Sequence, residues 1–220
     1  MEFQLNVYSG LQWSDLSFVL EGFGRTILLT LVAGALGTLL GAVVGWLRES
    51  LAVARVVLAP YVDVMRSVPL IIQFILVNSA FSAFGAPLDP LQVGILTLTL
   101  YMGALTSELV RSGLRSVRPE LRKASRSLGM SYWQELRHVS APLAVRTILP
   151  SWIGTVIGLT KDTALVSVIG YIELLRAAQI LIARTNEALL ILAGVGAAYF
   201  LICYPISRYS RKLERGLSHD

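Results

Sequence analysis

The sequence predicts an all-α integral membrane protein with five transmembrane helices, and three observations support this fold class. Of the 220 residues, 55% are apolar and 15% are charged, whereas soluble domains carry about a quarter charged residues. Five apolar runs approach the roughly 20 residues that a helix needs to cross hydrocarbon. Because only helices and closed barrels satisfy the backbone in lipid, and the runs are too long for barrel strands, each run is interpreted as a helix.

The five predicted spans follow one another with short connections, except for one long loop. We place the spans at about residues 24–46, 62–84, 91–110, 148–170 and 188–206, within a single transmembrane domain of residues 1–220. Pro87 and Pro90 mark a tight turn between the second and third spans. The long loop covers about residues 111–147.

The first span carries glycines at a spacing that favours close helix packing. Gly37, Gly41 and Gly45 are four residues apart, so they share one helix face. Small residues at this spacing let two helices approach closely in lipid. Two interpretations are open: a static helix contact, and a seam that slides during a transport cycle.

Basic residues set the expected orientation. Three lie between the first span and the start of the second, eight lie in or beside the long loop, and four follow the fifth span. These fifteen of the nineteen Lys and Arg residues fall on one side of a five-span alternation. Loops rich in Lys and Arg stay in the cytoplasm. The N-terminus is therefore expected outside, and the long loop and C-terminus inside.

The same distribution explains the basic composition without a nucleic-acid partner. The formal net charge is +5, but most of the positive residues belong to cytoplasmic loops. The single cysteine, Cys203, cannot form an internal disulfide, and His138 and His219 have no neighbouring ligands that would predict a metal site. No phosphate-binding loop of the Gly-rich, Lys-Ser/Thr type is present. We therefore expect no enzyme activity and no cofactor in this chain.

The long loop predicts two short helices joined by a corner. Leu121, Ala124 and Leu128 repeat at helical spacing and form an apolar stripe. Gly129 follows at a position where helices end in a left-handed residue. Ser131, with Gln134 three residues later, is a capping box that begins the second helix. From these residues alone, the loop is either a docking element for another protein or a hairpin on lipid headgroups.

Ionisable and polar residues within the spans are candidate functional groups, because charge at membrane depth is expensive. Lys161 lies roughly 20 Å along the fourth span from its cytoplasmic start. Its ammonium group could bind a substrate carboxylate, or it could be neutralised by Asp162 or by another helix. Gln73 and Asn78 of the second span could line a polar path or form hydrogen bonds between helices.

Three further sets of charged residues have simpler interpretations. Glu108 and Arg111 are three apart and are expected to pair on a helix surface. The same spacing predicts a second pair between Asp63 and Arg66. Arg176 and Arg184 fall in the outer loop before the fifth span, where they are either solvated or face a docked protein.

The long loop resembles a motif of a known family. In permease subunits of bacterial binding-protein-dependent ABC importers, the cytoplasmic loop reads Glu-Ala-Ala, three residues, Gly, and a Pro after a long gap. Lys123-Ala124-Ser125, Gly129 and Pro150 stand at these positions. Lys replaces the Glu of the motif and Ser replaces its second Ala, so contacts made by that Glu are not carried over.

Two more segments resemble the polar amino-acid branch of this family. The stretch from Tyr61 to Gln73 is similar to the start of its second span. Lys161-Asp-Thr163 is similar to a Lys-Asp-Thr-Ser-Leu segment, with Ala164 in place of the Ser. With the Cys203-Tyr-Pro tail, the resemblance covers about residues 24–217.

The resemblance implies a multi-pass inner-membrane permease that imports polar amino acids by alternating access. It implies a second permease copy or a paralogue, a pair of ATPase subunits that bind the ATP, and a substrate-binding protein. A permease for another small solute and an ATPase-independent secondary transporter are the alternatives. The residues implied for ATPase coupling are Leu121, Ala124, Ser125, Leu128, Gly129, Met130 and Ser131. The residues proposed for the substrate path are Gln73, Asn78, Lys161, Asp162 and Thr163.

Overall fold

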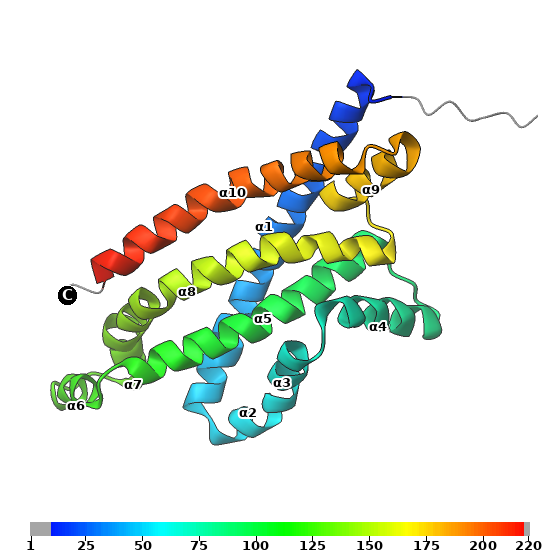
Figure 1. Cartoon of the computed structure of the whole chain (residues 1–220). Helices are drawn as coiled ribbons and strands as arrows, with labels where there is room; N and C mark the ends of the chain where they lie inside the picture. The colour runs from blue at the N-terminus through cyan, green and yellow to red at the C-terminus, as the bar shows by residue number, and fades with distance from the viewer. Residues whose placement is uncertain (1–9, 218–220) are drawn as a thin grey trace, which may run out of the picture.

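The computed structural model describes residues 10–217, which are helical except for short connections (Figure 1). Besides its α-helices, this part contains one π-helical turn, η1, and one 3₁₀ segment, η2. In chain order the elements are α1 (Trp13–Ser50), α2 (Ala52–Val57), α3 (Ala59–Ser67), α4 (Leu70–Ala83), α5 (Pro90–Ser116), α6 (Pro119–Ser127), α7 (Tyr132–Glu135), η1 (Leu136–Ser140), α8 (Ala141–Asp162), η2 (Thr163–Ile169), α9 (Leu174–Thr185) and α10 (Ala188–Leu217).

Four helical stretches are long and apolar enough to cross a membrane, and a bent pair brings the number to five if it counts as one span. This confirms the all-α membrane fold. The four stretches correspond to the first, third, fourth and fifth predicted spans; each is longer than predicted at one end or both, and the fourth ends one residue before the predicted limit of 170. They are Trp13–Ser50, Pro90–Ser116, Tyr132–Ile169 and Ala188–Arg215.

The second predicted span, residues 62–84, is wrong as a single helix. The chain bends by 115° between the α2–α3 stretch and α4. Val68 is extended, with φ −84° and ψ 131°, and Pro69 is the N-cap residue of α4. Proline has no backbone N–H, and its ring disfavours helical geometry in the preceding residue, so the helix ends before it. The pair of elements is a broken span or a re-entrant segment.

The long helices pack around α5. In Figure 1, α5 and α8 run side by side, α1 crosses them, and α10 lies along the far side of α8. The central contact contains buried apolar side chains from α1, α4, α5, α8 and η2: Leu29, Ala33, Leu70, Phe74, Leu98, Met102, Leu159 and Val166. Many large apolar side chains elsewhere are exposed, as expected for surfaces covered by lipid or by partner chains.

The glycine face of α1 lies directly against α5. A methyl group added at Gly41 would lie 2.5 Å from Cβ of Thr106 and 2.7 Å from the carbonyl oxygen of Gly103. Gly37 and Gly45 are equally close to α5. The glycine spacing therefore does mark a close helix contact; whether this contact slides stays a prediction.

The connection between the fourth and fifth spans contains a helix that we did not predict, α9. Glu173 caps its start, accepting hydrogen bonds from the backbone N–H groups of Leu175 and Arg176, both at 2.8 Å. Its end is tied to the start of α1 by an ion pair between Arg184 and Asp15. Arg184 is thus partnered within the chain rather than simply solvated.

Candidate functional site

The long loop has the predicted helix, corner and helix. Pro119 begins α6, and Gly129 has a φ of +85°, in the left-handed region that glycine adopts without strain. Ser131 caps α7: its hydroxyl accepts from the Gln134 N–H at 3.4 Å, and the Gln134 side chain accepts from the Ser131 N–H at 2.8 Å. The second helix is one short turn, which continues through η1 into α8.

The apolar stripe of α6 points away from the rest of the chain. Leu121 is 45% exposed and Leu128 is 82% exposed, and Ala124 is also exposed. Ser125, by contrast, is buried and donates to the carbonyl oxygen of Arg122. Because exposed leucines lose favourable burial, this stripe is suited to contact with another molecule.

Side-chain contacts fix the loop to the ends of α1 and α5. Tyr132 is hydrogen-bonded to Ser50 at 2.7 Å and accepts a hydrogen bond from the Trp46 ring N–H at 3.2 Å. The Trp46 and Trp133 rings pack with their centroids 5.3 Å apart. The Arg122 guanidinium donates to the carbonyl oxygen of Leu114 on α5. The loop is therefore attached by hydrogen bonds to two membrane-spanning helices.

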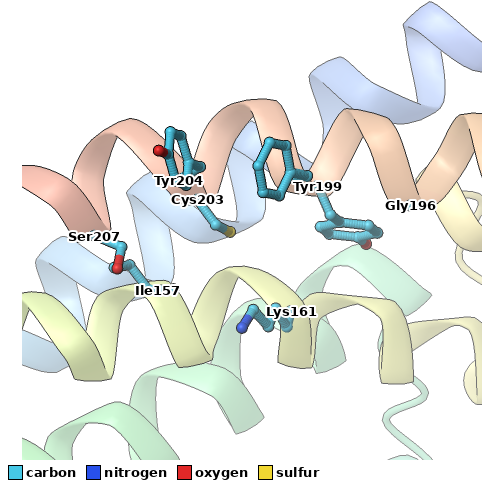
Figure 2. Close-up of a pocket in the computed structure, with 8 residues that line it drawn as sticks. Ile157, Lys161, Gly196, Tyr199, Cys203, Tyr204 and Ser207 are labelled. Atoms are coloured by element: carbon cyan, nitrogen blue, oxygen red, sulfur yellow. The ribbon is translucent and has the colours of Figure 1, made fainter.

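Lys161 lies in a groove between α8 and α10. Figure 2 shows Lys161 on α8 below Tyr199 and Cys203 of α10. The groove has a volume of about 500 Å³. Its lining residues are Ile157, Lys161, Gly196, Tyr199, Phe200, Cys203, Tyr204 and Ser207. Within residues 10–217, Lys161 forms no salt bridge, but it interacts electrostatically with the neighbouring carboxyl group of Asp162, so both interpretations of Lys161 stay predictions.

The other proposed substrate-path residues have different surroundings. Gln73 is buried in the first turn of α4, and its amide reaches back across the break to donate to the carbonyl oxygens of Met65 at 2.9 Å and Val68 at 2.8 Å. These bonds satisfy carbonyl groups that the break leaves without helical partners. Thr163 is fully buried and donates to the carbonyl oxygen of Thr160 at 2.7 Å.

Asp162 and Asn78 are both partly buried, which leaves them available to a path between helices. Asp162 ends α8, directly after Lys161, and Asn78 lies in the middle of α4. Since α4 packs against η2, the second predicted span does come close to the segment that follows Lys161. The five candidates are thus distributed around α4, the end of α8 and η2 rather than gathered in one pocket.

The structure contains a cluster of arginines at the loop end of the bundle that the sequence did not predict. Arg48, which the sequence marks only as a basic loop residue, is 4% exposed and pairs with Glu108 at 2.5 Å. Glu108 also pairs with Arg111 at 3.0 Å, as predicted. The predicted pair between Asp63 and Arg66 is wrong, because Arg66 reaches toward Glu108 instead, at 4.0 Å. The available signal was that Arg48 and Glu108, which have opposite charges, fall at the cytoplasmic ends of the first and third predicted spans.

The buried carboxyl group of Glu173 was also missed. It is fully buried at the start of α9, and burial raises the pKa of this carboxyl group above its usual range despite the two N–H groups that it accepts from. Its electrostatic neighbours include Tyr199, which also lines the Lys161 groove. Sequence alone gave no indication, because the fold brings Glu173 and Tyr199 together from separate helices.

Comparison with known proteins identifies the class. Residues 11–219 match the family described as the binding-protein-dependent transport system inner membrane component. The glutamine transport system permease protein of Escherichia coli is 32% identical over 210 residues, covering 92% of this chain and 94% of that protein. The L-cystine transport system permease protein of Bacillus subtilis is 33% identical over 198 residues, covering 89% and 85%. The chain belongs to this family of multi-pass inner-membrane transport proteins.

Solved structures agree with this assignment. A crystal structure of an amino acid ABC transporter with histidines contains a chain with a TM-score of 0.83 and 28% identity, covering 94% of this chain and 99% of that one. An inward-facing methionine ABC transporter has a TM-score of 0.79 at 21% identity and supports the fold alone. The protein is a permease subunit of an ABC importer, related to the permeases of amino-acid importers.

Proposed function

We propose that this permease imports polar amino acids, with its N-terminus outside the membrane and its loop in the cytoplasm. A dimer of this chain, or a pair with a paralogue, would enclose the path. A substrate-binding protein would deliver the amino acid, and two ATPase subunits would bind and hydrolyse the ATP. The observation that supports coupling is the exposed stripe of Leu121 and Leu128 on a loop tied to α1 and α5.

The substrate class is supported by the similarity to named relatives and by the chemistry of Lys161. Relatives are named as transporting glutamine, L-cystine and arginine, all of which carry an α-carboxylate. Lys161 supplies an ammonium group without an ion-pair partner in the described part of the chain, beside a groove that also offers Tyr199 and Ser207. A positive charge at membrane depth favours a carboxylate ligand. An importer of another small solute is the second possibility.

The test is a reconstitution with the ATPase subunits in proteoliposomes. Purified binding proteins loaded with glutamine, arginine or cystine are supplied outside, and ATP hydrolysis is measured with and without each one. We expect an amino-acid-loaded protein to stimulate hydrolysis and radiolabelled substrate to accumulate. Stimulation only by a sugar-loaded or metal-loaded protein would refute the proposed substrate class.

A further inference from the structure

The arginine cluster at the loop end of the bundle contains more positive charge than its carboxylate balances. Glu108 pairs with Arg48 and Arg111, and Arg66 lies 4.0 Å away. Arg55 adds a fourth guanidinium, whose Nε donates to the carbonyl oxygen of Arg48 at 3.2 Å. Three guanidinium groups thus lie around the Glu108 carboxylate and a fourth contacts the backbone of Arg48, so these four arginines carry three more positive charges than Glu108 balances.

Several of these groups retain hydrogen-bonding capacity. The buried Nε atoms of Arg48 and Arg111 have no hydrogen-bond partner in the described part of the chain. Arg55 is exposed, and the side chain of Arg66 is 46% exposed. Asp63, the acidic residue of α3, forms no ion pair with any described residue. The exposed guanidinium groups of Arg55 and Arg66 are therefore the ones that an added anion can reach, and charge-assisted hydrogen bonds would stabilise it there.

A separate observation concerns α2, the short helix that carries Arg55. None of its residues is buried, and Val53, Val56 and Val57 are 75%, 73% and 67% exposed. In Figure 1, α2 lies at the edge of the fold, beyond the end of α1. A short helix with exposed valines and an arginine, at the end of a membrane-spanning helix, has the composition of an interfacial segment.

We propose that this corner binds one anionic phospholipid of the inner leaflet, and the proposal rests on the predicted orientation. Arg55 and Arg66 bind the headgroup phosphate, and the valines of α2 contact the acyl chains. Guanidinium groups suit this role because they bind phosphate through two parallel N–H groups. The Arg48–Glu108 pair holds the ends of α1 and α5 together beneath the headgroup.

The experiment measures lipid retained by the purified permease–ATPase complex. The complex is reconstituted in nanodiscs that contain equal amounts of phosphatidylglycerol and phosphatidylcholine, and it is then released into detergent for native mass spectrometry. The double variant Arg55→Gln/Arg66→Gln should retain roughly 30-fold less phosphatidylglycerol, from about 1 kcal/mol for each basic residue near the surface. Phosphatidylcholine retention should not change.

The matched control is Arg208→Gln/Arg211→Gln on α10, which removes the same charge from the same predicted side of the membrane. An equal loss in both double variants, or no loss in the first, would overturn the proposal, because general attraction to an anionic surface would then suffice. A photoreactive residue in place of Val56 gives an independent readout. Lipid adducts support the site, whereas adducts to the ATPase or to a second permease would show that protein covers α2.

Discussion

The guanidinium of Arg48 and the carboxylate of Glu108 form an ion pair across the contact between α1 and α5, with Nη1 2.5 Å from Oε1. Arg48 is almost fully buried, and Glu108 also pairs with Arg111. The pair lies at the same end of the bundle as the loop, since the neighbouring Glu49 pairs with Arg115 of α5. The two helices are therefore fixed to each other by charge as well as by glycine packing.

Removing one partner of this pair should destabilise the protein more than removing both. Glu108→Leu leaves Arg48 buried without its carboxylate, at a cost of about 3 kcal/mol. The double variant Arg48→Met/Glu108→Leu should recover part of that loss, because the most deeply buried charge of the cluster, Arg48, is no longer left unpaired; Arg111 still lacks its carboxylate, so recovery is partial. Thermal inactivation of the detergent-purified complex at a fixed scan rate measures the loss of stability in the single variant and in the double variant. Equal loss in the single and double variants would contradict this account.

Gly41→Ala should weaken the contact between α1 and α5. The added methyl group would meet Thr106 and the backbone of Gly103, so the helices must separate, at a cost of about 1–3 kcal/mol. Gly24→Ala is the control on the same helix, because nothing lies within 4 Å of that position. It should be neutral or slightly stabilising. The apparent melting temperature should therefore fall in Gly41→Ala and stay unchanged or rise slightly in Gly24→Ala.

Gly129→Val should uncouple the ATPase subunits while leaving membrane insertion intact. A β-branched residue is strained at a φ of +85°, so the corner would open and the stripe of α6 would be misdirected. Gly129→Asn should retain most of the coupling, because asparagine tolerates this region. The measurements are the amount of ATPase subunit retained by the purified complex and the ATP hydrolysis that substrate stimulates.

Gly85→Val is the matched control for that substitution. Gly85 has a φ of +73° and open space around it, so its backbone strain is comparable, but it lies at the opposite turn after α4. It should leave hydrolysis stimulated by substrate. Normal coupling in Gly129→Val would instead favour a loop that merely rests on lipid headgroups.

The orientation is testable by cysteine labelling. In a Cys203→Ala background, Ser82→Cys at the end of α4 and Ser127→Cys at the end of α6 are both exposed sites. An impermeant thiol reagent added to spheroplasts should label the first, and the second should react only after lysis. Labelling of both in intact spheroplasts would contradict the orientation predicted from the basic residues.

Lys161→Met should impair transport more than assembly. The described part of the chain gives Lys161 no ion pair to lose, so the permease should accumulate normally in the membrane. Loss of a charged hydrogen bond to substrate should reduce uptake about tenfold or more. Lys212→Met, near the end of α10, removes the same charge as a control. Failure of Lys161→Met to accumulate would point instead to an ion pair with a partner chain.

The sequence predicted elements whose signals are local. Hydropathy placed the helices around Gly41 and Met102, and a glycine followed by a capping box placed the corner at Gly129. The break at Pro69 was missed although proline is a local signal, because the apolar run continues through it. Clusters that depend on packing were also missed. Nothing local indicates that Arg48 reaches Glu108, since 59 residues separate them and only the contact of α1 with α5 brings them together.

The attachment of the loop has a mechanical consequence. Tyr132 and Arg122 anchor the loop to α1 and α5, whereas α10 contacts the fold chiefly through α8 and α9. A displacement of α6 is therefore expected to reach α1 and α5 first, since the loop is hydrogen-bonded to both helices. The outermost helix, α10, packs against α1 near the start of both helices, where Ile191 and Val195 contact Phe18, Val19 and Phe23, at the end of α1 that is far from the loop. The groove that holds Lys161 lies between α8 and α10, so a rotation of α8 relative to α10 would change its width.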